Sequence, residues 1–157
     1  MSRVFRYQTT VRPEWIDYNG HMQDAYYGLI FSYAVDAVQD AIGVDASYRD
    51  RTGCTIYLLE DHKSYLHEVK EGAALRVEMR VLDHDAKRFL LHGQMFEGEE
   101  LVAVGEFVEL HVARHPSPHA APMPEDVQAA LATARLSSDA AAQLPNRARA
   151  LALRRPA

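Results

Sequence analysis

DAYYGLIFSYAVDAVQDAIG, residues 24–43, is the stretch of this chain that decides its fold. Its apolar residues recur at spacings of three and four, which predicts an amphipathic helix of about 17 residues that begins at Ala25. Asp24 is the expected N-cap, and Gly43 is the expected C-terminal stop. The residues expected on the apolar face are Tyr26, Leu29, Ile30, Tyr33, Ala37, Val38 and Ala41.

Strand-like runs lie on both sides of this helix. One run precedes it at residues 5–11, and four follow at residues 54–69, 74–82, 88–96 and 101–112, separated by short turns. A short second helix is expected over residues 45–51, and another begins at Pro124. The order of one strand, one long helix and four antiparallel strands predicts an α+β fold, in which a sheet of about five strands wraps the helix.

The charge divides the chain into an acidic body and a basic tail. The 157 residues are 48% hydrophobic with a net charge of −5, which suits one domain. Residues 134–157 carry +4 and the rest carries −9. We expect the catalytic body within residues 1–113, a proline-broken linker and short helix over 114–133, and a tail over 134–157. Because the tail has few large apolar side chains, we expect it to be a peripheral extension.

Composition excludes several classes of protein. The single cysteine, Cys54, cannot form an intramolecular disulfide framework, and it is expected to be a small core residue. The first residues lack the apolar core of a signal peptide, and no run approaches the ~20 apolar residues that cross a bilayer. The acidic body opposes binding to phosphate backbones. We therefore expect a cytoplasmic protein that binds neither nucleic acid nor a membrane.

The densest group of polar side chains lies at residues 15–27, directly before the helix. Asp17, Asn19 and His21 stand at alternate positions, so in a locally extended loop their side chains would point to one side. The helix start adds backbone N–H groups that can polarise a carbonyl. These are the ingredients of acyl transfer. The pattern equally fits an ordinary Asx turn before a helix, with His21 bonded to the backbone, and the residues alone leave both interpretations open.

A resemblance to a known family favours the first interpretation. The run Asp17-x-Asn19-Gly20-His21-Met22-x-x-x-x-Tyr27 resembles the active-site segment of hotdog-fold thioesterases, in the branch that acts on 4-hydroxybenzoyl-CoA and acyl-carrier-protein thioesters. The resemblance covers residues 1–113. Gln23 and Asp24 replace the family's usual asparagine pair. Residues 14–22 look most similar to thioesterases of carnitine breakdown, which act on betainyl-CoA.

The resemblance implies hydrolysis of an acyl-CoA thioester to a free acid and CoA. Asp17 would act as general base or nucleophile, and the helix N-terminus would polarise the thioester carbonyl. Asn19 and His21 would orient water or stabilise charge, with Glu60 completing the catalytic set. The residues expected to contact the substrate are Trp15, Gly20, Met22, Tyr26, Tyr27, His62 and Arg88. No cofactor is expected, because coenzyme A is part of the substrate.

Other interpretations of these residues remain open. Glu60 and His62 also fit solvated strand positions, and the aromatic residues around the loop fit core packing as well as a surface for a quaternary ammonium group. Basic residues that could meet the CoA phosphates are Lys63, Lys87, Arg88 and Arg114. No paired-cysteine signature points to a metal site, and no metal is expected.

Two other functions share this scaffold, and the family suggests an assembly. A non-catalytic acyl-CoA or acyl-carrier binding protein would bind without turnover. A hotdog dehydratase or isomerase would need a different His/Asp pairing. A sheet curled round one helix leaves a strand edge that must be covered. Since the family pairs subunits with active sites at their interface, we expect a homodimer or homotetramer.

Overall fold

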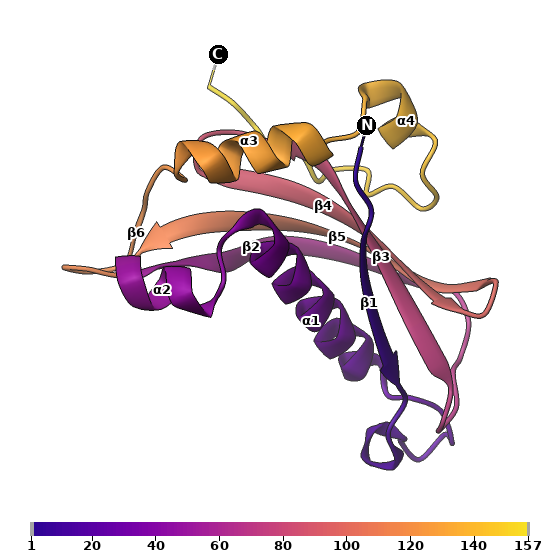
Figure 1. Ribbon diagram of the computed structural model, residues 1–157. Helices are drawn as coiled ribbons and strands as arrows, with labels where there is room; N and C mark the ends of the chain where they lie inside the picture. The colour runs from indigo at the N-terminus through magenta and orange to yellow at the C-terminus, as the bar shows by residue number, and fades with distance from the viewer. Residues whose placement is uncertain (1, 157) are drawn as a thin grey trace.

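One long helix lies against a curved antiparallel sheet in the computed structural model, which describes residues 2–156 (Figure 1). The helix is α1 (Asp24–Ile42). The sheet order is β1-β3-β4-β5-β2, with the short β6 paired to β5. The strands are β1 (Phe5–Thr10), β2 (Cys54–Tyr65), β3 (Ala74–His84), β4 (Arg88–Glu97), β5 (Glu100–Ala113) and β6 (His119–Ala120). The α+β class and the wrapped helix are confirmed.

The shorter helices connect or cover these elements. They are the 3₁₀ turn η1 (Pro13–Trp15), α2 (Ala46–Thr52), α3 (Glu125–Ala134) and α4 (Ser138–Ala142). The expected second helix is α2, and the side chain of Asp45 caps it by accepting a hydrogen bond from the Tyr48 N–H at 2.8 Å. No helix within residues 2–156 is long and apolar enough to cross a membrane.

The C-terminal end of α1 matches the prediction, and the N-terminal end does not. Gly43 ends the helix in the left-handed conformation with φ of 98°, as predicted. Asp24 is not the N-cap: it is the first helical residue, and Gln23 precedes it without a side-chain cap. A carboxylate in the first turn still complements the partial positive charge of the helix start.

The buried face of α1 is rotated from the predicted one. Tyr33 and Ala41 are exposed, whereas Phe31 and Val35 are buried. The full buried set is Tyr27, Ile30, Phe31, Ala34, Val35, Val38, Gln39 and Ile42. Because apolar residues occupy more than half of the circumference, periodicity alone fits two neighbouring faces, and the sheet covers the face that carries Phe31.

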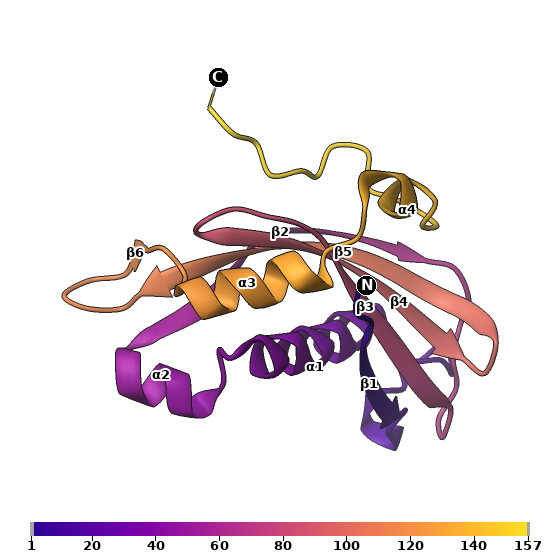
Figure 2. The same ribbon diagram turned by 45° about the horizontal axis from the view of Figure 1, so that its top comes forward.

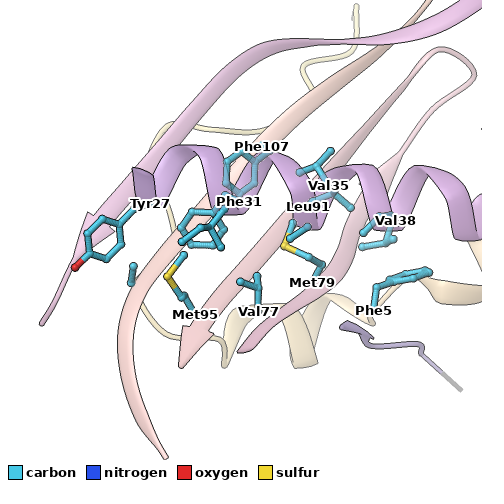
Figure 3. Close-up of a cluster of buried hydrophobic side chains, with 14 of the residues drawn as sticks. Phe5, Tyr27, Phe31, Val35, Val38, Val77, Met79, Leu91, Met95 and Phe107 are labelled. Atoms are coloured by element: carbon cyan, nitrogen blue, oxygen red, sulfur yellow. The ribbon is translucent and has the colours of Figure 1, made fainter. Parts of the chain in front are cut away.

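The core lies between α1 and the sheet (Figure 3). Phe31 packs on Phe107 of β5 with ring centroids 5.3 Å apart, and Met79 and Met95 from β3 and β4 lie beside it. Gly93 of β4 permits this approach, since a Cβ atom there would stand 2.6 Å from the Met79 sulfur and 3.0 Å from the Phe31 ring. Phe31 of the helix thus packs across β3, β4 and β5.

The tail is not peripheral, which corrects that expectation. It crosses the sheet face opposite α1 (Figure 2), where Ala141, Leu151 and Leu153 are buried against strand residues. Arg147 donates to the Glu106 carboxylate at 2.8 Å, and the Ala148 N–H donates to the same oxygen at 2.9 Å. Leu136, Leu144 and Ala148 of the tail are partly buried in the same cluster. These apolar contacts and polar bonds hold a segment whose composition alone gave no sign of an anchor.

Candidate active site

A tight turn, and not an extended strand, shapes the polar loop. The Gly20 N–H donates to the Asp17 carbonyl at 3.0 Å, and the Asp17 N–H donates to the His21 carbonyl at 3.0 Å. Gly20 takes φ of 80°, a left-handed conformation in which glycine carries no steric cost. The expectation of local extension is therefore wrong. Asp17 and His21 are neighbours because the turn folds the chain back on itself.

Asn19 occupies the exposed tip of this turn. Its N–H donates to Oδ1 of Asp17 at 2.8 Å, which makes the Asx turn that was one of the two interpretations of the sequence. This bond fixes the Asp17 carboxylate and leaves Oδ2 without a partner among residues 2–156. The Asx turn and a catalytic carboxylate are therefore compatible in one geometry.

His21 contacts a carboxylate that the sequence did not single out. Its Nε2 lies 3.0 Å from Oε2 of Glu68, which belongs to the segment after β2. The same segment anchors the loop, since the Met22 N–H donates to the Val69 carbonyl at 2.9 Å. No periodicity or motif marks Glu68, because it reaches the loop only through the tertiary fold.

Trp15 supports the loop through core packing. It is 5% exposed, its ring stacks on Tyr26 at a centroid distance of 5.5 Å, and the Arg12 guanidinium lies 5.4 Å from its centroid. The Gln23 N–H donates to the Trp15 carbonyl at 2.9 Å, which ties this support to the start of α1. Little of the Trp15 ring is left for a ligand, so its contacts are those of core packing.

A hollow of about 200 Å³ joins the end of the loop, the start of α1 and the end of β2. It is lined by Met22, Asp24, Tyr27, Tyr65, Leu66, His67 and Glu68. The Tyr27 hydroxyl donates to the His67 carbonyl at 3.1 Å, and burial raises the pKa of Tyr27, so the hydroxyl keeps its proton. The Tyr65 ring stands edge-on to Tyr27 at 5.3 Å. Two predicted substrate contacts, Met22 and Tyr27, thus share one cavity.

The first turn of α1 borders the same hollow through Asp24. Asp24 and Ala25 are exposed, and the N–H groups of a first helical turn have no partner within the helix, although that of Tyr26 donates to the Gln23 carbonyl at 3.0 Å. Such groups, with the partial positive charge of the helix start, can hold a carbonyl oxygen as it gains charge. Asp17 does not line this hollow; the turn that carries it is joined to the wall of the hollow through His21, whose Nε2 contacts Glu68. A carboxylate and oxyanion donors close to one cavity are the arrangement that acyl transfer requires.

Glu60 and His62 are not brought to this loop within one chain. Their strand positions pair with Val108 and Glu106, and His62 lines a hollow beside Asn146 and Arg147 of the tail. That hollow lies on the sheet face opposite α1. A bulge between Leu58 and Glu60 shifts the pairing of β2 with β5 there.

The basic residues considered for the CoA phosphates are largely engaged elsewhere. Arg88 binds the Asp85 carboxylate with two nitrogens, at 2.9 and 2.6 Å, and pairs with Leu110 near the far end of β5. Lys63 binds Asp61, and Arg114 donates to the Gly53 carbonyl at 3.1 Å. Arg88 is therefore separated from the loop that it was expected to serve.

Comparisons with known proteins agree on one family. Residues 11–131 match the model of the thioesterase-like superfamily. The chain is 45% identical over 133 residues to the betainyl-CoA thioesterase of Pseudomonas aeruginosa, which covers 82% of each chain. It is 44% identical over 107 residues to the L-carnitine dehydrogenase/betainyl-CoA thioesterase of Agrobacterium fabrum, of which it spans 22%.

Solved structures of similar sequence share the fold. A Staphylococcus aureus protein solved in complex with CoA superposes with a TM-score of 0.78 at 29% identity, over 85% of each chain. A candidate thioesterase from Pseudomonas putida superposes with a TM-score of 0.76 at 32% identity, over 100% of this chain and 99% of its own. The hotdog arrangement expected from the loop and the long helix is confirmed.

Proposed function

Because the chain belongs to the thioesterase-like superfamily, we propose that it hydrolyses betainyl-CoA to the free trimethylammonium acid and CoA, with Asp17 as the catalytic carboxylate. The chain is a thioester hydrolase that acts on acyl-CoA. The choice of acyl group rests on its 45% identity to the Pseudomonas aeruginosa enzyme. The choice of Asp17 rests on one observation: its carboxylate is fixed on the turn whose His21 is bound to the wall of the hollow at the start of α1.

The proposed chemistry assigns a role to each group. The thioester oxygen accepts hydrogen bonds from the first-turn N–H groups, which stabilise the oxyanion. With Oδ1 held by Asn19, Oδ2 of Asp17 either takes a proton from the attacking water or attacks the carbonyl carbon itself. The carbon–sulfur bond then breaks, and the CoA sulfur leaves and takes up a proton. If Asp17 is the nucleophile, this step leaves an anhydride between the acyl group and Asp17, which a water molecule hydrolyses to release the acid and restore the carboxylate. His21, held by Glu68, stands across the turn to orient the water.

A panel of acyl-CoA thioesters tests the proposed function directly. Betainyl, short-chain, aromatic and long-chain thioesters are incubated with the purified protein, released thiol is followed, and binding is measured in parallel by calorimetry. The proposal predicts turnover, with the highest kcat/KM for betainyl-CoA. Binding of every thioester without release of thiol would identify an acyl-CoA binding protein instead, and a preference for another acyl group would overturn the substrate.

We also propose that two copies pair along β2. This strand lies at the end of the sheet order, so one of its edges has no partner among residues 2–156. Its exposed apolar residues are Tyr57, Leu58, Leu59 and Tyr65. An unpaired edge with such residues favours association over solvation. Light scattering is expected to give the mass of a dimer or tetramer, and a monomer at all concentrations would contradict the pairing.

A further inference from the structure

A second hollow, of about 160 Å³, lies between α1 and strands β2 and β5. Apolar walls come from Val35, Leu58 and Phe107. Three carboxyl groups from three different elements also line it: Asp36 of α1, Asp61 of β2 and Glu109 of β5. Neither the loop motif nor the family match accounts for acidic groups at this place.

Glu109 is the unusual member of this group. It is 3% exposed, and its carboxyl group has no hydrogen bond or ion pair with any side chain or backbone group of residues 2–156. Burial, together with the charges of Asp36 and Asp61, raises the pKa of Glu109 to about 7. A carboxyl group at this depth is ordinarily paired. The Glu109 carboxyl lines the hollow, so a ligand bound there can reach it.

The charges around the hollow do not balance. Lys63 binds Asp61, and the charge of Arg49 acts on Asp36, but no cation is assigned to Glu109. The charge of Asp40 also acts on Asp36, so when all these groups are ionised four negative charges face two positive ones. A cationic ligand would reduce this excess of negative charge.

The residues that line the hollow limit the kind of cation that it can bind. No group of three His, Cys, Asp or Glu side chains within residues 2–156 is arranged to hold a metal ion. The apolar residues would leave a small, strongly hydrated cation without solvation. A trimethylammonium group suits both features, because its methyl groups pack on apolar walls while its charge faces the carboxylate. The Phe107 ring already has the Lys63 ammonium 6.0 Å from its centroid, so cations approach this ring.

We propose that this hollow binds the trimethylammonium head of the acyl group, with Glu109 as the residue that selects a cationic substrate. The proposal rests on the proposed function, since it concerns the substrate of the same enzyme. The exposed residues of its lining are Ser32 and Asp36 of α1 and Leu58 and Asp61 of β2, the strand through which two copies are proposed to pair. One methylene separates the nitrogen of betainyl-CoA from its thioester carbonyl, and Asp36 lies about three turns along α1 from Asp24. The head bound in this hollow therefore belongs to a thioester whose carbonyl is held by the loop and the α1 start of the partner subunit.

Two substrates of the same shape isolate the contribution of charge. In 3,3-dimethylbutyryl-CoA a carbon atom replaces the nitrogen of betainyl-CoA, so only the charge differs. The wild-type protein is expected to prefer betainyl-CoA in kcat/KM by tenfold or more, and Glu109→Gln is expected to reduce that ratio by about tenfold. Glu14→Gln, an exposed control on η1, retains the ratio. An unchanged ratio in Glu109→Gln overturns the proposal.

Binding of tetramethylammonium measured by calorimetry separates this proposal from the catalytic one. The wild-type protein is expected to bind it with an affinity that rises about tenfold from pH 6 to pH 8, because Glu109, which faces Asp36 and Asp61, ionises in that range. The charges of Arg49 and Asp40 act on Asp36, and Lys63 binds Asp61. Glu109→Gln loses most of this rise. If thioesters are hydrolysed but tetramethylammonium does not bind, the proposed cation site is refuted and the proposed function is retained. If tetramethylammonium binds but no thioester is hydrolysed, the proposed function is refuted and the proposed cation site is retained.

Two further variants probe the same pocket and its nearest rival. Should Glu109→Gln not fold, Asp36→Asn tests the same pocket and is expected to weaken tetramethylammonium binding in the same direction. Tyr65→Leu tests the aromatic hollow at the start of α1 as the rival cation site. Loss of the charge preference in Tyr65→Leu, with the preference kept in Glu109→Gln, would overturn the assignment to Glu109.

Discussion

Two carboxyl groups on this molecule are held in opposite ways. Asp17 is half-buried at a turn, where the Asn19 N–H fixes one of its oxygens. Glu109 lies 3% exposed in an apolar hollow, and burial raises its pKa to about 7. A glutamate in such surroundings lowers the stability of the fold at neutral pH. Stability alone favours an uncharged residue at position 109. Recognition of a ligand would account for a glutamate there.

The pH dependence of stability tests this cost. The raised pKa of Glu109 means that the folded state holds its proton more tightly than the unfolded state, so stability falls as pH rises from about 4.5 to about 7. The contribution is about 3 kcal/mol when fully developed. Glu109→Gln removes it. Urea denaturation at pH 5 and pH 8 is expected to show the variant losing roughly 2 kcal/mol less than the wild type between these values.

The comparison has a matched control in Glu14→Gln, whose side chain is exposed. Its stability curve is expected to follow the wild type at both pH values. Parallel curves for Glu109→Gln and the wild type would show that the Glu109 carboxyl is solvated, contrary to its position in the structure.

At the level of elements, α1 and the turn before it determine how the site is positioned. The length, the end at Gly43 and the position of α1 on the sheet follow from local pattern. The buried face does not, because apolar residues cover so much of the helix that the choice depends on Phe31 meeting Gly93 across the core. In the same way, Asp17 could be found from its motif, whereas Glu68 is brought to His21 only by the return of the chain after β2.

Two glycine substitutions test the seating of α1 on the sheet. Gly93→Ala places a methyl group 2.6 Å from the Met79 sulfur and 3.0 Å from the Phe31 ring, and a loss of about 1–3 kcal/mol in the free energy of unfolding is expected. Gly28→Ala within α1 meets only the Lys63 side chain at 3.8 Å, and a gain of roughly 0.5–1 kcal/mol is expected. Denaturant unfolding measures both, and equal effects would contradict the close approach.

At the scale of the whole molecule, the tail covers the sheet face opposite α1. The basic tail and the acidic body pair directly: Arg147 binds Glu106, and Arg155 binds Asp83 at 3.1 Å with both nitrogens. Alternating strands predict one solvated sheet face, but β5 is buried on both faces, from Val102 to Glu109. In the sequence, the apolar residues on both faces of β5, interrupted by Glu106 and Glu109, indicate a second cover. The composition of the tail does not show that the tail is this cover, because its packing depends on a few specific ion pairs and hydrogen bonds.

The contribution of the tail is testable at a single residue. Arg147→Ala leaves the Glu106 carboxylate, 1% exposed, without its ion-pair partner, and a loss of roughly 2–3 kcal/mol in the free energy of unfolding is expected. Arg149→Ala removes a nearby arginine of the tail and is expected to change stability by less than about 0.5 kcal/mol. Equal stability of the two variants would mean that the tail does not hold Glu106 in solution.

The most direct measurement is the rate of thiol release from betainyl-CoA by Asp17→Asn, compared with the wild type and with Glu14→Gln. The substitution keeps the shape of the turn and removes the carboxylate that would activate water or attack the thioester. We predict that kcat falls by about 100-fold or more while KM changes little, with Glu14→Gln unaffected. A folded Asp17→Asn protein that retains the wild-type kcat would contradict the assignment of Asp17.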